Sequence, residues 1–335
     1  MPALFSLIIP MYNVEKYITA CLESVFPQLN DEIEVILVDD GGPDKSAEIA
    51  QRLIDDNQPK AKNVRIIYQE NAGLSGARNT GIKNSTGKYL CFLDSDDLLM
   101  DDFFSTVRKN IENNGKANIF AFNAVSFSEM KDNKPVVTGS IPVANTVTEH
   151  VGENHDSNEE NAFLLGECNR GLWYAWARVY KRELFEYIEF PVGRNFEDFQ
   201  TVPLLYMNSQ NSIVNIPKPL LAYRINPQGI TRSASRKELN DLDHTIEFYH
   251  KKIAQHPEWH NYMATLYVSA LKSRFLVSLD ILGFVQACKE LNEQKRNHAR
   301  ISAAERKVLS FRNSLFYSST LLYWCVHSAK KFIKN

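Results

Sequence analysis

The order of apolar and amphipathic segments predicts an α/β protein with a doubly wound, mostly parallel sheet. Four short apolar runs alternate with stretches whose apolar residues recur at helical spacing. Strands buried on both faces appear as continuous apolar runs, and the alternation implies right-handed crossovers between parallel neighbours. Such strands end at one edge of the sheet, where open α/β sheets bind ligands.

The first hundred residues supply the strands and their polar ends. The predicted strands are 4–9, 33–38, 64–68 and 89–93, with helices predicted at 14–29, 45–56 and 98–114. Each strand runs into polar residues, in order Pro10-Met11-Tyr12-Asn13, Asp39-Asp40-Gly41-Gly42, Gln69-Glu70-Asn71 and Asp94-Ser95-Asp96-Asp97. Any one of these could be an ordinary turn or cap, but four at one edge predict a binding crevice.

The acidic residues after the fourth run predict a metal-diphosphate site. Asp94 and Asp96 are hard oxygen donors, which suit Mg²⁺ or Mn²⁺ when the remaining ligands are phosphates and water. The alternative is that residues 95–97 cap the following helix, whose first turn favours acids. The chain has neither the glycine spacing of a dinucleotide fold nor a P-loop, which disfavours a nicotinamide enzyme.

Four segments, 6–13, 35–46, 70–82 and 89–97, together resemble the nucleotide-binding half of the family-2 inverting glycosyltransferases of GT-A fold. The resemblance implies a UDP-sugar donor and a divalent metal. It places Asp94 near the ribose or the metal and Asp96 on the metal. For the nucleotide it implies contacts from Pro10, Tyr12, Asn13, Asp40, Gly73 and Arg78, with Asp39 in support. Gly42-Pro43 departs from the pattern, which usually has Ser or Thr after the glycine.

A second acidic pair, Glu197-Asp198, precedes a stretch with helical spacing. Taken alone, it is an ordinary helix N-terminus. Resemblance to the E-D element of the same family implies that Asp198 takes the proton of the acceptor hydroxyl, the minimum that an inverting attack requires. The flanking segments 172–180 and 222–231 extend the family pattern. There, Arg224 is expected to reach diphosphate oxygens, while Trp173 and Trp176 either face a sugar or fill the core.

The chain is predicted to hold a donor half at 1–125, an acceptor half at 126–235 and a helical region at 236–335. Residues 128–161 are expected to form loops or a small hairpin, with a solvated acidic end at 149–160. The net charge of −2 gives no reason to expect nucleic-acid binding. Five cysteines without a C-x-x-C motif, and a first strand with no leader before it, favour a reducing cytoplasm.

The C-terminal segment 295–335 is strongly basic. It has nine Lys or Arg residues against Glu305 alone, a local charge of +8, and contains the apolar run 315–326. That run is shorter than the roughly 20 residues that span a bilayer. It can lie on the inner face of the cytoplasmic membrane, or it can be a terminal helix packed on the domain.

Together with these observations, the resemblance implies an inverting, metal-dependent transferase that moves a hexose from a UDP-sugar to a glycan hydroxyl. Resemblance to members that assemble bacterial capsule, O-antigen or lipooligosaccharide implies a lipid-linked acceptor. A polyprenyl-phosphate sugar transferase would attack with phosphate and would not need Asp198 as a base. A sugar nucleotidyltransferase would carry a glycine-rich basic loop where this chain has Pro10 to Asn13. A non-catalytic sugar-nucleotide-binding protein would need neither Asp96 nor Asp198.

Overall fold

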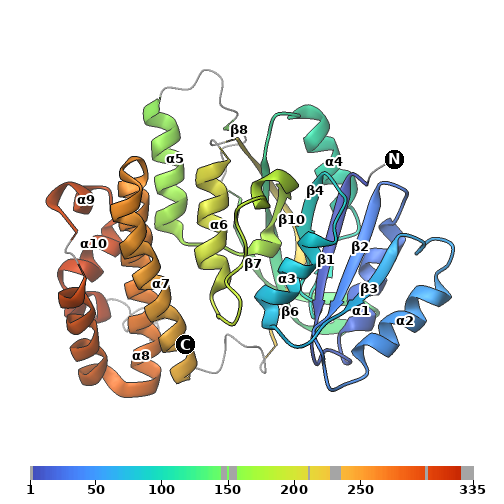
Figure 1. Cartoon of the computed structure of the whole chain (residues 1–335), viewed down its shortest axis with the longest axis horizontal. Helices are drawn as coiled ribbons and strands as arrows, with labels where there is room; N and C mark the ends of the chain where they lie inside the picture. The colour runs from blue at the N-terminus through green and yellow to red at the C-terminus, as the bar shows by residue number, and fades with distance from the viewer. Residues whose placement is uncertain are drawn as a thin grey trace. The chain divides into compact units, whose positions relative to one another are not determined.

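The computed structural model describes residues 3–144, 149–150, 157–209, 212–226, 235–298 and 301–325. The chain divides into two compact units (Figure 1). The first comprises residues 1–154 and 173–229 and holds the sheet. The second comprises residues 155–172 and 230–335 and is helical. The predicted C-terminal helical region is therefore present, joined by a helix from the middle of the chain.

The four predicted parallel strands are confirmed. They are β1 (Phe5–Met11), β2 (Ile33–Asp39), β3 (Val64–Tyr68) and β4 (Tyr89–Phe92). Strand β1 pairs in parallel with both β2 and β4, and β2 pairs in parallel with β3. The order β3-β2-β1-β4 therefore places all four carboxyl ends at one edge of the sheet.

The sheet continues beyond β4 as a mixed sheet, in the order β9-β6-β10-β5. These strands are β9 (Arg178–Lys181), β6 (Ile119–Lys131), β10 (Ile213–Arg224) and β5 (Leu98–Leu99). Strand β9 is antiparallel to both of its neighbours, and β10 is parallel to β6. The antiparallel β9 joins the parallel strands β1 to β4 to the β6 and β10 pair.

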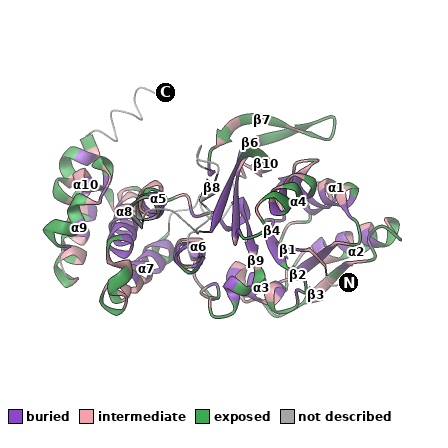
Figure 2. Cartoon of the chain, turned by 90° about the horizontal axis from the view of Figure 1, so that it is seen from above, coloured by how far each residue is buried: buried purple, intermediate pink, exposed green. Residues whose placement is uncertain are grey.

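The expected hairpin after residue 128 is confirmed. Strand β7 (Lys134–Ile141) pairs antiparallel with the end of β6. The turn residues Asp132 and Asn133 both have positive φ, as two-residue hairpin turns require. The hairpin projects from the sheet with mostly exposed residues (Figure 2). The end of this stretch is not all loop, because the acidic segment 149–160 contains β8 (Glu149–His150) and the start of helix α5 (Ser157–Arg170). The side chains of that segment lie outside the described part of the chain.

Helices cover both faces of the parallel strands, which confirms the doubly wound arrangement. They are α1 (Ile18–Val25) with the short 3₁₀ turn Phe26–Gln28, α2 (Ser46–Asp56) and α3 (Gly73–Lys83). Leu7 and Ile9 share a core with α1 and α2. Ile8 faces α3, where a Cβ on Gly81 would lie 2.3 Å from the Ile8 Cγ2. The small residue at Gly81 therefore allows α3 to pack closely on β1.

The helix predicted at 98–114 begins later than expected. Leu98 and Leu99 form β5, pairing with Ala222 and Leu221 of β10, and the helix α4 starts at Phe103 and ends at Asn113. Pairing with a strand from far along the chain overrides the local helical pattern. Residues 95–97 therefore do not cap a helix, which removes that alternative explanation for the acids.

Within the described residues, the second unit contains α5, two long helices and two short ones. The latter four are α7 (Arg236–Gln255), α8 (His260–Asn297), α9 (Ala303–Lys307) and α10 (Phe311–Ser318), with the short 3₁₀ turn Pro257–Trp259 between the first two. Helix α8 is kinked at Gly283, where φ is 75°. Arg274 on α8 pairs with Asp243 on α7 and with Glu290 beyond the kink.

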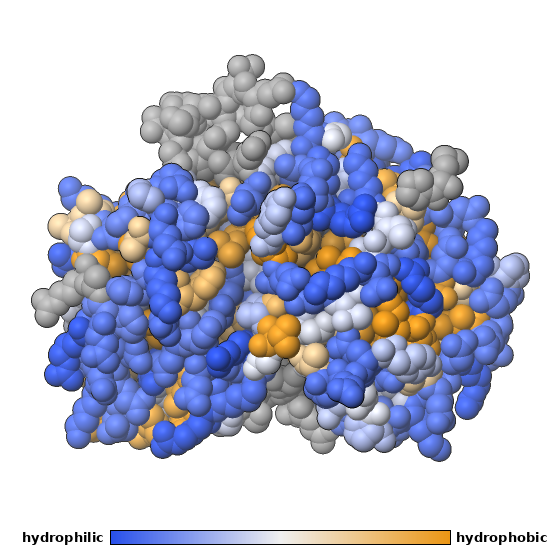
Figure 3. All heavy atoms as spheres, viewed as in Figure 1, coloured by the Kyte–Doolittle hydropathy of each residue, from blue (hydrophilic) through white to orange (hydrophobic). Residues whose placement is uncertain are grey.

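No helix within the described residues is long and apolar enough to cross a membrane. The face shown in Figure 3 is covered mainly by hydrophilic residues, and apolar side chains appear there as separate patches.

Candidate active site

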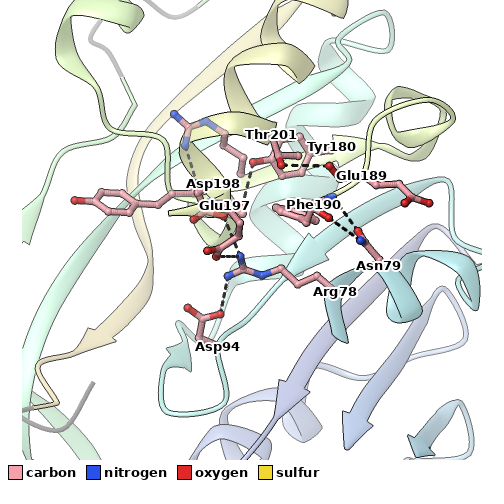
Figure 4. Close-up of polar contacts among 12 residues, drawn as sticks. Arg78, Asn79, Asp94, Tyr180, Glu189, Phe190, Glu197, Asp198 and Thr201 are labelled. Carbon is pink, nitrogen blue, oxygen red and sulfur yellow. Dashed lines mark hydrogen bonds and ion pairs between the residues drawn. The ribbon is translucent and has the colours of Figure 1, made fainter. Parts of the chain in front are cut away.

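Three carboxylates from distant parts of the chain converge on the buried guanidinium of Arg78 (Figure 4). Arg78 lies on α3, and its side chain is only 1% exposed. Its Nη1 donates to Glu197 Oε1 at 2.7 Å and to Asp198 Oδ1 at 2.9 Å, while its Nη2 donates to Asp94 Oδ1 at 3.0 Å. One side chain thus connects the acid after β4 with the acidic pair.

The acidic pair begins helix α6 (Glu197–Asn208), as the sequence predicted. Phe196, immediately before it, has φ 61°, a left-handed conformation that is uncommon for a bulky residue. The backbone N–H of Ala175 donates to Asp198 Oδ2 at 2.9 Å. With Arg78 on Oδ1, both oxygens of Asp198 are held, so its carboxylate has a defined orientation.

The rings of Phe190 and Phe92 lie against the Arg78 guanidinium, and a pair of hydrogen bonds with Asn79 holds the Phe190 backbone. The guanidinium carbon lies 5.2 Å from the ring centre of Phe190 and 6.0 Å from that of Phe92. Asn79 Nδ2 donates to the Phe190 carbonyl at 2.8 Å, and the Phe190 N–H donates to Asn79 Oδ1 at 2.9 Å. These contacts keep Phe190 against the cation. Asn79 and Ala175 lie in the family-like segments 70–82 and 172–180 but were not singled out there, and Phe190 lies in no motif.

The buried environment shifts the pKa values of the groups in this cluster. Burial raises the pKa of Asp198 above its ordinary value, and the Arg78 charge opposes that rise. Burial and the neighbouring Asp198 charge raise the pKa of Glu197 to about 7. Burial acts to lower the pKa of Arg78, but the surrounding carboxylates raise it overall, so the guanidinium stays charged. A carboxylate with a raised pKa is a stronger base than one in water.

Arg224 anchors the loop that carries the D-x-D motif. Its backbone N–H donates to Asp97 Oδ1 at 2.7 Å, and its Nε donates to the Asp96 carbonyl at 2.7 Å. Its guanidinium lies 5.0 Å from the ring centre of Tyr17 and 4.5 Å from that of Phe127. Asp97 is fully buried and holds the end of β10 in place. The expected contact of Arg224 with a diphosphate stays a prediction.

Asp94 and Asp96 are suited to hold part of a metal's coordination shell. Burial and the charge of Asp94 raise the pKa of Asp96, so a cation between them would relieve repulsion. Asn226 Nδ2 donates to Asp96 Oδ2 at 3.3 Å. Within the described residues no group of three or more His, Cys, Asp or Glu side chains could hold a metal. Two carboxylates fit Mg²⁺ or Mn²⁺ that takes its other ligands from phosphates and water.

The ends of β1, β2 and β3 come together as expected. A Cβ on Gly42 would lie 3.2 Å from the Asn13 nitrogen, and one on Gly41 would lie 3.3 Å from the Asn71 nitrogen. Pro10 is buried within β1, whereas Tyr12 is 50% exposed. Asn13 is exposed and has φ 56°. This edge therefore presents Tyr12 and Asn13 toward solvent.

The two aspartates after β2 have different environments. Asp40 is buried, and its Oδ1 accepts from Gln69 Nε2 at 2.6 Å and from the Ala72 N–H at 2.8 Å. Asp39 is more exposed, and its Oδ1 accepts from the Gly42 N–H at 3.4 Å. Asp40 thus orders the loop that leads to α3, which begins at Gly73 with φ 73°.

The segment before the acidic pair includes the short 3₁₀ turn Ala175–Ala177. Trp173 and Trp176 are each 4% exposed, so both fill the core and neither presents its ring to a sugar. Tyr174, which the sequence did not single out, is exposed between them. Residues 227–231, the end of the expected second flanking motif, lie outside the described part of the chain.

The comparisons with known proteins agree with this geometry. The family model for Glycosyl transferase family 2 matches residues 6–187, more than half of the chain. The chain belongs to glycosyl transferase family 2. The match runs from β1 past β9, so it covers Arg78 and the D-x-D residues and ends before the acidic pair.

Two relatives have the same activity class in their names. Glycosyltransferase GlyA of Streptococcus pneumoniae serotype 4 is 35% identical over 240 residues, which are 71% of this chain and 33% of GlyA. This family-2 chain therefore spans about a third of the length of that relative. EpsJ of Bacillus subtilis, an uncharacterized glycosyltransferase, is 31% identical over 257 residues, 76% of this chain and 70% of EpsJ.

Two solved structures share the fold of this family-2 chain. Residues 1–349 of S. aureus TarS, in complex with UDP-GlcNAc, superpose with a TM-score of 0.64 at 16% identity, covering 95% of this chain and 87% of TarS 1–349. The mannosyltransferase PcManGT of Pyrobaculum calidifontis, in complex with GDP-Man and Mn²⁺, has a TM-score of 0.52 at 15% identity, covering 96% and 88%. These similarities confirm the predicted GT-A fold.

Proposed function

We propose that this glycosyltransferase is inverting and metal-dependent, and that it moves a hexose from a UDP-sugar to a hydroxyl of a growing cell-surface glycan. The observation that carries the proposal is the pair of bonds from Arg78 to Asp94 and to Asp198. These bonds bring the D-x-D motif and the candidate base to the same guanidinium, which supports a single reaction centre. The complex of TarS with UDP-GlcNAc supports the choice of a uridine donor.

In the proposed reaction Asp198 removes the proton from the acceptor hydroxyl as that oxygen attacks the anomeric carbon. Arg78 and the Ala175 N–H hold the two carboxylate oxygens, so the base does not need to reorient. Arg78 also keeps Asp198 ionised, because its charge lowers the pKa that burial raises. Asp94 and Asp96 would hold a divalent cation, which would supply the positive charge that a departing diphosphate requires.

The nucleobase subsite is assigned to the ends of β1 and β2. Tyr12 is exposed enough to stack on a base, and Pro10 and Asn13 flank it. The resemblance implied Asp40 as the base contact with Asp39 in support. Asp40 is buried and its Oδ1 already accepts two bonds from the protein, so we propose the more exposed Asp39 in its place as the acceptor for the uracil N–H. In this proposal residues 1–125 form the donor half of the sheet unit, and the rest of that unit, residues 126–154 and 173–229, carries the acceptor side.

Removal of the metal is expected to abolish tight UDP binding. Isothermal titration of the protein with UDP in Mn²⁺ should give an affinity at least roughly tenfold higher than in chelator, since the diphosphate and two carboxylates repel one another without a cation. Asp96→Ala should reproduce the chelator result in the presence of Mn²⁺. GDP should bind more weakly than UDP under the same conditions.

The matched control is Asp101→Ala, which removes an exposed carboxylate five residues further along the chain. It should titrate like the unmodified protein. Equal UDP affinity in chelator and in Mn²⁺ would contradict the metal assignment. Tighter binding of GDP would contradict the uridine assignment and leave the metal in place.

A lipid-linked acceptor would require contact with the membrane, for which we propose the C-terminal segment of the second unit. Phe316 and Tyr323 are buried there, with ring centres 5.2 Å apart, so part of the apolar run is core. Phe311, Leu321 and Leu322 are exposed, as are the cations Arg306, Lys307 and Arg312. Lys330, Lys331 and Lys334 lie outside the described residues.

Replacing the exposed apolar residues should release the protein from membranes. The triple variant Phe311→Ser, Leu321→Ser, Leu322→Ser is expected to lose most sedimentation with vesicles of phosphatidylglycerol and phosphatidylcholine at low salt. The exposed side chains would insert at the acyl boundary, and each nearby cation adds on the order of 1 kcal/mol on anionic lipid. Val285→Ser, which alters another exposed apolar residue of this unit, is the control. Unchanged sedimentation of the triple variant would refute the contact.

A further inference from the structure

Three aromatic rings of the sheet unit form a parallel stack that ends at the surface. Tyr174 and Trp176 have ring centres 4.9 Å apart and planes inclined by 13°. Trp176 and Tyr223 follow at 5.6 Å and 18°. Trp176 is buried in the middle, whereas Tyr174 is 38% exposed. Tyr174 is therefore the most exposed ring of the stack and is supported by the buried Trp176, while Tyr223 at the other end is half-buried.

Both ends of this stack are bonded to the reaction centre through their sequence neighbours. Tyr174 precedes Ala175, whose N–H holds Asp198. Tyr223 precedes Arg224, whose N–H holds Asp97 and whose Nε holds the Asp96 carbonyl. The stack thus extends between the backbone that positions the base and the backbone that positions the D-x-D loop.

The backbone that carries the exposed Tyr174 ring is also held in place. Arg178 Nη1 donates to the Tyr174 carbonyl at 2.8 Å, and Arg178 itself is fully buried, with its Nε donating to the Tyr206 hydroxyl at 2.7 Å. Burial and the charge of Asp198 raise the pKa of the Tyr174 hydroxyl, so it stays neutral. A ring that is ordered before binding loses little entropy when a ligand covers it.

A pyranose ring is a suitable occupant for such a surface. Its C–H groups form an apolar face that packs on an aromatic ring, while its hydroxyls point outward to polar groups. Isolated exposed aromatics are common on proteins and need no function. That explanation does not account for a ring held parallel to two others and one residue from the backbone group that orients a candidate base.

We propose that Tyr174 is the sugar-stacking platform of the acceptor subsite, on which a pyranose ring of the acceptor lies so that one of its hydroxyls reaches Asp198. This inference rests on the proposed glycosyl transfer and names the surface that receives the acceptor. Trp176 and Tyr223 support the platform from below, and neither contacts the sugar.

The test uses saturation-transfer NMR with a panel of methyl glycosides of hexoses and N-acetylhexosamines. Binding is measured on the full chain with and without UDP and Mn²⁺. Tyr174→Ala should weaken glycoside binding at least roughly tenfold, whereas Tyr174→Phe, which keeps the ring, should stay within about threefold of the unmodified protein. Tyr187→Ala removes another exposed tyrosine ring from the same unit and should have no effect.

UDP titration of the same variants separates this inference from the donor assignment. Tyr174→Ala should bind UDP as the unmodified protein does, since the platform serves the acceptor. A protein that binds glycosides through Tyr174 but fails to bind UDP would refute the uridine donor and leave the platform standing. Glycoside binding that survives Tyr174→Ala, or no saturation transfer from any glycoside to the unmodified protein, would overturn the platform.

Discussion

Asp198→Asn is expected to lower turnover by at least about a hundredfold while leaving the affinity for UDP within about threefold of the unmodified protein. The amide keeps the size of the side chain but has no basic oxygen, and removal of a general base typically costs 10²-fold or more. Turnover is measured as UDP released in the presence of acceptor, and donor binding by titration. A split between the two readouts identifies a residue that acts in chemistry rather than in donor binding.

The matched control is Glu189→Gln, which changes an exposed carboxylate that precedes the same helix and pairs with Lys83. It should retain full turnover. If Asp198→Asn has near-normal turnover, Asp198 is not the base, and attack by a phosphate, as in a polyprenyl-phosphate sugar transferase, becomes the better mechanism. A product with the anomeric configuration of the donor would contradict inversion altogether.

Arg78→Gln is expected to destabilise the fold and to reduce turnover at least tenfold at pH 7. Removing one partner of a buried ionic cluster costs about 3–5 kcal/mol of unfolding free energy, because Asp94, Glu197 and Asp198 are left facing one another. Urea unfolding measures the first effect. The second arises because loss of the cation raises the pKa of Asp198, so more of the base is protonated.

The loss of stability in Arg78→Gln should depend on pH. The folded pKa of Glu197, about 7, lies above its ordinary value of 4.5, so its titration favours folding below 4.5 and that contribution is lost as the pH rises through 7. Arg78→Gln raises the folded pKa further, so its stability deficit should be larger at pH 8 than at pH 5.

Two other arginine variants serve as controls. Arg108→Gln breaks exposed pairs with Glu32 and Glu112 and should change stability by no more than about 1 kcal/mol. Arg78→Lys keeps the charge but has a different donor geometry, so it should recover part of the stability. An Arg78→Gln protein as stable and as active as the unmodified one would show that the guanidinium does not organise the base.

The sequence by itself determined the parallel half of the sheet and the position of the polar residues at its edge. Strands β1, β2 and β4 are buried almost throughout because helices cover both of their faces, and such apolar runs are visible without any knowledge of partners, whereas the edge strand β3 is only partly buried. The D-x-D motif follows β4 directly, so its placement at the carboxyl edge follows from strand order alone. The helical spacing of the apolar residues after Glu197 and Asp198 likewise placed this pair at the start of a helix.

Only the tertiary structure decided which side chains meet. Arg78 looked like a nucleotide contact, yet its guanidinium holds acids that lie 16 and 120 positions away in the chain. Residues 98 and 99 have a helical pattern but form a strand, because β10 supplies partners for their backbone. Trp173 and Trp176 are core while Tyr174 is exposed, which depends on the packing around each ring. Local patterns record which face of an element is buried, whereas contacts between distant residues depend on how the elements pack.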